Sequence, residues 1–192
     1  MCAQPVPEWL LPPAEGFTAD DLDDLPDLPP HTELIDGSLV LVSPQKAFHT
    51  LMLYLIEAGL RRSVPEDMRV RREMTMTLAE RQRLEPDLMV VDAGAVAGAD
   101  QSSFPAEAAL LVIEVVSPES VIRDRERKPQ LYAQAGIPNL WRVEPDQGRP
   151  VVYTYERDPA TGEYVATGIH RDKLSVAHPF TIDIDLTEID TM

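Results

Sequence analysis

The spacing of apolar residues predicts a chain that alternates between strands and helices. From Gln45 to Arg62 the apolar positions follow the 3.6-residue period of an amphipathic helix. Residues 68–78 alternate between apolar and polar side chains, as a half-buried strand does, although Arg72 breaks the apolar side. Two shorter, almost continuously apolar segments, 86–92 and 108–116, are expected at the buried centre of a sheet.

The remaining pattern completes a mixed α/β fold around one central sheet flanked by helices. Asp36-Gly37 lies between two apolar strands within residues 33–42, and this dipeptide is a strong hairpin signal. Residues 122–135 are expected to be mostly helical, with Pro129 starting the regular part or kinking it. Residues 93–107 are predicted to be a loop, and further strands are predicted at 139–144, 151–156, near 164–169 and near 180–184.

The two ends of the chain differ from the middle in composition. Residues 1–30 are acidic and rich in proline, and they are predicted to form an arm with a short helical turn that starts at Thr18, with Asp21 in the position of a capping acid. Residues 31–186 are expected to form a single domain, and residues 187–192 an acidic tail. A length of 192 residues suits one domain with short extensions.

Several classes of protein are excluded or made unattractive by composition. Cys2 is the only cysteine, so neither an intramolecular disulfide nor a multi-cysteine zinc site is available. No apolar run approaches the ~18–20 residues that a membrane helix needs. The first residues have no Lys or Arg and contain several prolines, which argues against a signal peptide. We therefore expect a cytoplasmic protein without membrane contact.

The net charge of −16, from 17 basic and 33 acidic residues, argues at first against a nucleic-acid partner. The acidity belongs largely to the ends, however. Residues 1–36 hold nine acids and no Lys or Arg, and residues 181–192 hold four acids and no Lys or Arg. Residues 37–180 therefore carry a net charge of only −3. The acidic ends are expected to solvate the protein or to cover a sheet edge.

Familiar catalytic motifs do not occur in this sequence. It contains no phosphate-binding P-loop, no HExxH zinc motif, no dinucleotide fingerprint and no GxSxG nucleophile elbow. The four histidines, at 31, 49, 170 and 178, show no paired spacing for zinc. Acidic residues in apolar strands are the remaining candidates for chemistry.

Glu114 and Asp87 are the two acids placed where a carboxylate is most costly. Glu114 interrupts the apolar segment ALLVIEVV, and a carboxylate there must be paired or bound to a metal. An arginine on a neighbouring strand is one such partner. Asp87 opens the preceding strand, where it could equally belong to a turn, since Pro-Asp is common turn chemistry. Two carboxylates on adjacent strands would offer hard oxygen ligands to Mg²⁺ or Mn²⁺.

A lysine near such a metal would orient the attacking water or stabilise the charge that develops on a phosphate. The natural position, two residues after Glu114 on the same strand face, is occupied by Val116. Lys128 is the nearest alternative. Asp124, Lys128 and Tyr132 recur at intervals of four residues and share one face of a helix. A surface Asp124–Lys128 ion pair without function would explain the same spacing.

These segments, in this order, resemble the Uma2 family of bacterial endonuclease-like proteins, which have a PD-(D/E)xK restriction-endonuclease-like core. The matching stretches are ELIDGSLVLVSP at 33–44 followed by His49, EPDLMVV at 85–91, LLVIEVVSPES at 110–120 and DRERKPQLYAQAGIPNLWRVEP at 124–145. The resemblance implies a restriction-endonuclease-like sheet and, residue by residue, a first catalytic acid at Glu33, metal ligands at Asp87 and Glu114, and a relocated lysine at Lys128. The chain departs from the parent pattern at Val116, where the lysine is missing.

A purely structural role is an alternative interpretation for three of the residues in the matching stretches. A solvated strand end would account for Glu33, a half-buried helix residue for His49, and a core aromatic side chain for Tyr132. Trp141 is likewise expected in the core.

Two functions of different class are compatible with these residues. The first is a divalent-metal-dependent endonuclease that hydrolyses DNA with Mg²⁺ or Mn²⁺. It would be expected to act as a homodimer, because cutting two strands calls for two sites. The second is a catalytically idle module that keeps the fold for binding or assembly. A costly buried carboxylate favours the first. The acidic composition favours the second or weak DNA binding, with Arg69/Arg71/Arg72 and Arg123/Arg125/Arg127 as phosphate contacts.

Overall fold

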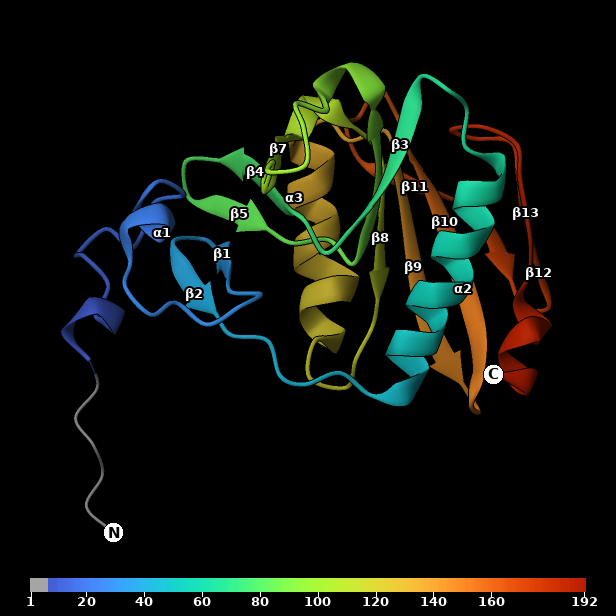
Figure 1. The fold of residues 1–192 in the computed structure, drawn as a ribbon, viewed down its shortest axis with the longest axis horizontal. Coiled ribbons are helices and arrows are strands. Elements are labelled where there is room, and N and C mark those ends of the chain that lie inside the picture. Colours follow the sequence, from blue (N-terminus) through green and yellow to red (C-terminus); the bar gives the residue numbers. More distant parts are fainter. Residues whose placement is uncertain (1–6) are drawn as a thin grey trace, which may run out of the picture.

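The computed structural model describes residues 7–192, and its centre is a six-stranded mixed sheet (Figure 1). Neighbouring strands are antiparallel except for the parallel pair β8–β9. In sheet order the strands are β11 (Tyr164–His170), β10 (Arg149–Arg157), β9 (Asn139–Asp146), β8 (Ala109–Val115), β6 (Leu88–Asp92) and β3 (Met68–Arg72).

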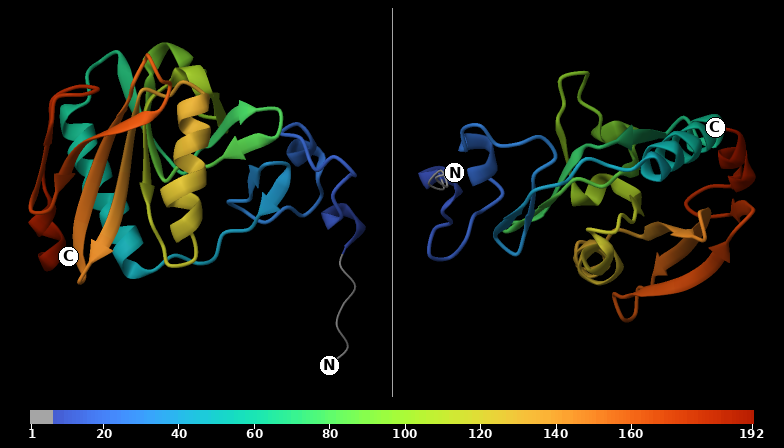
Figure 2. Two further views of the ribbon diagram at one scale, coloured as in Figure 1. Left: turned by 180° about the vertical axis from the view of Figure 1, so that it is seen from behind. Right: turned by 90° about the horizontal axis from the view of Figure 1, so that it is seen from below.

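Helices cover both faces of this sheet. Alternate residues of β6 and β8 point to opposite faces, so each strand contributes to two cores. Helix α2 (Ala47–Ser63) packs with Val90 and Ile113 on one face. Helix α3 (Lys128–Gln134) packs with Met89 and Val112 on the other. Figure 2 shows the two helices on opposite sides. The near-continuous apolar strands predicted from the sequence are buried for this reason, and the mixed α/β fold class is confirmed.

A second, five-stranded sheet lies beside the central one, which corrects the expectation of a single sheet. Its order is β2 (Ser38–Val40), β1 (Glu33–Ile35), β5 (Gln82–Leu84), β4 (Thr75–Ala79) and β7 (Ser103–Pro105). A third, two-stranded sheet is formed by β12 (Lys173–Val176) and β13 (Ile182–Asp185), and β13 contacts α2. Strand β7 falls within the segment predicted to be a loop.

The strand predicted at 68–78 is in fact two strands in two sheets. Glu73 adopts a left-handed backbone conformation, with φ of 48°, and its amide donates a hydrogen bond of 3.1 Å to the carbonyl of Asp87. The chain therefore leaves the central sheet after β3 and enters the second sheet as β4. The sequence pattern did not indicate this change of sheet, because apolar and polar residues alternate with the same two-residue period in both strands.

Local turn and helix signals are realised as predicted. Asp36 and Gly37 both have positive φ, 54° and 74°, as a tight hairpin turn between β1 and β2 requires. Pro129 lies in the first turn of α3. The preceding residues Arg123–Arg127 form a π-helical turn, η4, in which the amide of Lys128 bonds to the carbonyl of Arg123.

The acidic arm is packed against the second sheet where it can be described. Short helices η1 (Glu8–Leu10) and α1 (Asp21–Asp24) lie within it. Thr18 and Asp21 cap each other reciprocally, with N–O distances of 2.7 and 3.3 Å. Phe17 and Leu22 are buried against Leu34 of β1. Cys2 lies outside the described residues.

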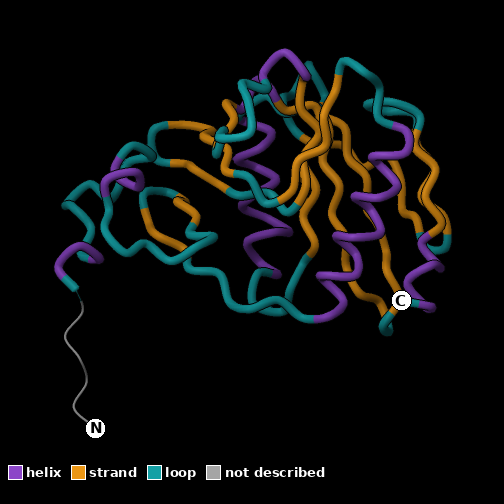
Figure 3. Tube along the Cα trace, in the orientation of Figure 1, coloured by secondary structure: helices purple, strands orange, loops and turns teal. Residues whose placement is uncertain are grey.

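The connections complete the chain (Figure 3). Short 3₁₀ turns are η2 (Ala93–Ala95), η3 (Ala106–Ala108) and, near the C-terminus, η5 (Leu186–Thr191). An irregular segment leads from β2 to α2. No helix in residues 7–192 is long and apolar enough to cross a membrane.

Candidate active site

An acidic cavity of about 430 Å³ opens where β8 ends and the η4–α3 helical segment begins. Residues from β1, the start of α2, the approach to β6, and η4 also line it. Its charged lining is mostly carboxylate, against one arginine and one lysine, together with His31 and His49. The acids are Glu33, Glu73, Glu85, Asp87, Glu114, Glu119 and Asp124. We refer to this space as the acidic cavity.

Glu114 lies at the inner wall of the acidic cavity, only 2% exposed. Strand β8 presents it to the same face as α3. Lys128 Nζ donates to both carboxylate oxygens, at 3.0 and 3.1 Å, and the Tyr132 hydroxyl donates to Oε1. The partner of the buried acid is therefore a lysine from the next helix rather than an arginine from a neighbouring strand.

Lys128 is buried, which corrects the alternative of a surface ion pair with Asp124. Its ammonium lies 2.9 Å from Glu33 Oε1, 3.0 Å from Glu114 Oε1 and 3.7 Å from Asp124 Oδ1. Both Lys128 and Asp124 are less than a tenth exposed. One ammonium is thus shared by three carboxylates that come from β1, β8 and η4.

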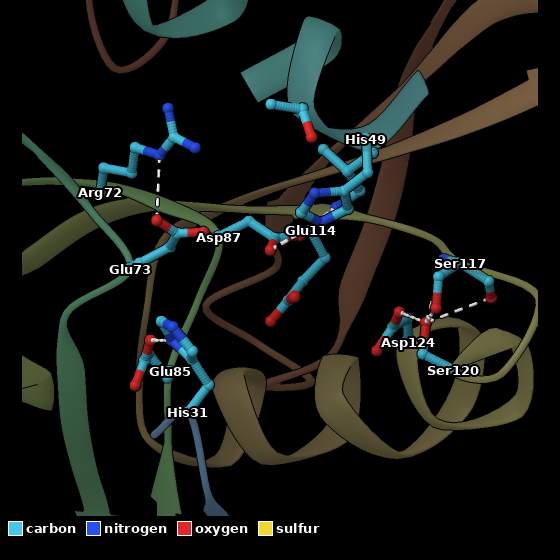
Figure 4. Close-up of polar contacts among 12 residues, drawn as sticks. His31, His49, Arg72, Glu73, Glu85, Asp87, Glu114, Ser117, Ser120 and Asp124 are labelled. Atoms are coloured by element: carbon cyan, nitrogen blue, oxygen red, sulfur yellow. Dashed lines mark hydrogen bonds and ion pairs between the residues drawn. The ribbon is translucent and has the colours of Figure 1, made fainter. Parts of the chain in front are cut away.

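Asp87 immediately precedes β6 and is held by two hydrogen bonds (Figure 4). His49 Nε2, from the first turn of α2, lies 2.9 Å from Oδ1, and the backbone amide of Val115 donates to Oδ2 at 2.6 Å. Because Val115 follows Glu114 on β8, the second bond brings the Asp87 carboxylate to the same end of the sheet as Glu114. Figure 4 draws the contact between His49 and Asp87, and both Asp87 and Glu114 line the acidic cavity.

Glu33 is also part of this cluster rather than a solvated strand end, because it is 2% exposed. Its Oε1 accepts a hydrogen bond of 3.0 Å from the amide of Glu85 as well as the ion pair from Lys128. Nearby, His31 Nδ1 contacts Glu85 Oε1. The structure therefore brings together all four site residues that the sequence suggested: Glu33, Asp87, Glu114 and Lys128.

The surplus of acids perturbs the ionisation of the cluster. Burial raises the pKa of Glu114 well above its usual range, and the negative charges of Asp87, Asp124 and Glu33 add to this, while Lys128 partly offsets it. Burial also raises the pKa of Asp124. Burial alone would lower the pKa of Lys128, but the surrounding carboxylates, Glu114 first, raise it well above the ordinary value. The lysine is therefore charged, and its single positive charge is shared by the three carboxylates of Glu33, Glu114 and Asp124.

These residues fit a hard divalent cation by the chemistry of their donors. Asp87 and Glu114 offer carboxylate oxygens, and Asp124 Oδ1 is buried without a hydrogen-bond partner. Mg²⁺ commonly takes one or two carboxylates and fills its other positions with water and substrate oxygens. In residues 7–192 there is no group of three or more His, Cys, Asp or Glu placed to hold a metal ion by protein ligands alone. A cation held here would therefore have Asp87 and Glu114 as its protein ligands, with water or substrate oxygens in its other positions.

Three further residues join the cluster without having been selected as site residues from the sequence. His49 contacts Asp87, Tyr132 contacts Glu114, and Asp124 contacts Lys128. The four-residue spacing of Asp124, Lys128 and Tyr132 was a usable signal for two of them. Tyr132 is fully buried, as expected of a core aromatic, yet its hydroxyl reaches the site. Trp141 is a core residue, as expected.

Comparison with known proteins gives a family and a fold. The model of the Uma2 family, described as "Putative restriction endonuclease", matches residues 19–187. A crystal structure of a nuclease of the DUF820 family from Anabaena variabilis, itself described as putative, superposes with a TM-score of 0.68 at 16% identity, over 91% of this chain and 98% of that one.

A second solved structure, NucC from P. aeruginosa in its cAAA-bound form, gives a TM-score of 0.34 at 8% identity, over 65% of this chain and 85% of that one. That score is too low to support an argument. No curated protein matches the sequence. The likeness to the Anabaena variabilis protein shows a shared fold.

Proposed function

This chain belongs to the Uma2 family, and from that premise we propose that it is a divalent-metal-dependent endonuclease that hydrolyses phosphodiester bonds of DNA. One observation carries the proposal: Asp87, Glu114 and Lys128, which lie far apart in the sequence, line a single cavity. A buried carboxylate cluster of this kind costs stability unless a cation compensates it. A need for these carboxylates as ligands of a catalytic metal ion would explain why the protein keeps them despite that cost.

In this proposal Asp87 and Glu114 hold Mg²⁺ or Mn²⁺. The ion would supply Lewis-acid stabilisation of the phosphate and a water of lowered pKa. His49 fixes the Asp87 carboxylate through the hydrogen bond to Oδ1, and Tyr132 fixes Glu114 in the same way. Both acids are thereby oriented before a substrate arrives.

Lys128 takes the role of the lysine that is missing at Val116. Its ammonium, on the first residue of α3, contacts Glu114 as a lysine from the same strand face would. There it can orient the attacking water and stabilise the charge that develops on the phosphate. Glu33 holds the ammonium in place and is positioned to receive a proton.

Cleavage of both strands of a duplex would need two such sites, so we further propose that the active form is a homodimer. A DNA substrate would place the activity in the cytoplasm. The observation that weighs against DNA is charge, since the chain carries −16 overall.

The test is cleavage of plasmid DNA by the full-length protein with Mg²⁺ or Mn²⁺, and with EDTA. We expect metal-dependent cleavage that Glu114→Gln and Asp87→Asn each reduce by at least ~10²-fold, the scale of losing one preorganised electrostatic group. Glu119→Gln is the matched control, because Glu119 lines the same cavity but is exposed. It should cleave like the parent.

Two outcomes would overturn the proposal. Cleavage by Glu114→Gln at the parent rate would remove the assigned metal ligand. No cleavage by the parent with either ion would favour the alternative, a binding or assembly module that keeps the fold.

A further inference from the structure

The acidic cavity is lined by a second positively charged side chain besides Lys128, that of Arg123, which the proposed mechanism does not use. Arg123 is the first residue of the π-helical turn η4, and its side chain is 26% exposed. Its Nε is buried and has no hydrogen-bond partner. The carboxylates closest to it are Glu33 Oε2 at 3.9 Å and Asp124 Oδ1 at 4.0 Å, which is ion-pair distance but beyond a hydrogen bond.

The other arginines of the same turn differ in this respect. Arg125 donates from Nε to Glu144 at 3.1 Å, and Arg127 donates from Nε to Asp36 at 2.8 Å. Arg123 donates no side-chain hydrogen bond to any residue in the range 7–192. A guanidinium has five N–H donors, and buried polar groups are rarely left without acceptors. The missing acceptor is therefore expected from outside the chain.

The π-helical turn explains how Arg123 reaches the cavity. The amide of Lys128 bonds to the carbonyl of Arg123 rather than to that of Asp124, so residues five apart are neighbours along the helix. Both cations consequently line the same cavity. Single π-helical turns are often found at functional sites.

We propose that Arg123 binds a non-bridging phosphate oxygen of the nucleic-acid backbone in the acidic cavity, beside the scissile bond. The planar guanidinium presents paired donors that match a phosphate. Glu33 and Asp124 orient it electrostatically without consuming its donors. The cavity otherwise holds seven acids and only one other Lys or Arg, so an incoming phosphate has few alternatives. The assignment rests on the proposed function, because it takes the substrate to be a phosphodiester.

The experiment measures binding rather than cleavage. Full-length protein binds a fluorescent DNA duplex in Ca²⁺, a hard oxygen-coordinating ion used in place of Mg²⁺, over a series of NaCl concentrations. Arg123→Met should weaken binding by about 10-fold or more. It should also make the plot of log affinity against log salt less steep by about 0.9, the value for one phosphate contact. Arg171→Met is the control, because it makes the same charge change at a side chain that is 60% exposed and lies outside the cavity lining. It should leave the slope unchanged.

An unchanged slope and affinity in Arg123→Met, with a parent that binds and cleaves DNA, would overturn this inference while leaving the nuclease function intact. Arg123→Gln repeats the test if the Met variant does not fold. If the parent binds no DNA, inorganic phosphate is added with Mg²⁺ and thermal unfolding is measured. Stabilisation of the parent but not of Arg123→Gln would support an anion site at Arg123 without nuclease function. Stabilisation of neither would overturn the anion site as well.

Discussion

Lys128 is the residue on which the stability of the cluster depends most. Its ammonium is within 4 Å of three buried carboxylates, from Glu33, Glu114 and Asp124. Removing one partner of a buried ion pair leaves uncompensated charge, which typically costs about 3–5 kcal/mol. Lys128→Met should therefore lower the free energy of unfolding by about that amount in a urea titration, in addition to abolishing cleavage.

Lys173→Met is the control for this prediction. Lys173 is 61% exposed and pairs with Asp183 on the surface, so its loss should change the free energy of unfolding by no more than about 0.5 kcal/mol. Equal stability of the two variants would mean that Lys128 is not the cation that balances the buried acids. The sequence placed Lys128 on the correct helical face, but its burial depends on Glu33 and Glu114, which arrive from distant strands.

Glu114 gives the site a pH dependence in the metal-free protein. Burial raises the pKa of Glu114 above its ordinary value of 4.5. At a pH between the pKa of Glu114 in the unfolded chain and its raised pKa in the folded protein, the folded protein binds more protons than the unfolded chain. The free energy of unfolding therefore falls as the pH rises through this range. The raised pKa values of Glu85 and Asp124, both due first to burial, act in the same direction.

Thermal unfolding in EDTA from about pH 5 to 8 measures this dependence. We expect the midpoint of the parent to fall with rising pH, Glu114→Gln to show a shallower fall, and Mg²⁺ to raise the parent midpoint most at the higher pH. A steeper fall in Glu114→Gln than in the parent would contradict the assignment.

At the scale of elements, helix α1 shows that the acidic arm is structural as well as charged. Leu22 of α1 is buried beside Phe17 and Leu34, so the arm covers apolar surface of the second sheet. Leu22→Ala should lower the free energy of unfolding by about 2 kcal/mol or more, the cost of a buried Leu→Ala change. Leu11→Ala is the matched control, since Leu11 is 59% exposed.

The two leucines are compared by urea unfolding. A Leu22→Ala variant as stable as Leu11→Ala would show that the arm is not part of the folded unit. The sequence left two interpretations of this arm open, solvation and edge covering. The contacts of Phe17 and Leu22 match neither, because Leu34 lies in β1, an inner strand, and the arm therefore packs on a face of the second sheet. These contacts could not be anticipated, because Leu34 lies in another element.

Sequence periodicity predicted an element well where one apolar face of that element packs against the core along its whole length. Helix α2 has one regular apolar face, which packs against the central sheet and β13, and its limits are close to those expected. Strands β3 and β4 share one continuous alternation, yet a single left-handed residue, Glu73, sends them into different sheets. Strand register and sheet membership depend on long-range pairing, which local pattern does not encode.

At the scale of the whole molecule, charge is distributed differently from what the sequence suggests. The sequence assigns most of the net charge of −16 to the ends, but the fold also concentrates seven acids around one cavity. Glu33, Asp87 and Glu114 could be picked out by their apolar neighbours and by the family resemblance. The sequence indicated Arg123 only as one of six arginines that could contact phosphate, and His49 only as part of a matching stretch. Their places at the cavity follow from a π-helical turn and from the packing of α2.

The central claim is that Asp87 and Glu114 share a divalent cation. Crystals of the full-length protein soaked in Mn²⁺, with anomalous diffraction recorded at the manganese edge, test it most directly. The account predicts one anomalous peak in the acidic cavity within about 2–2.5 Å of an oxygen from each of the two carboxylates. No peak there, with Glu114 still bonded to Lys128 and Asp87 to His49, would contradict it.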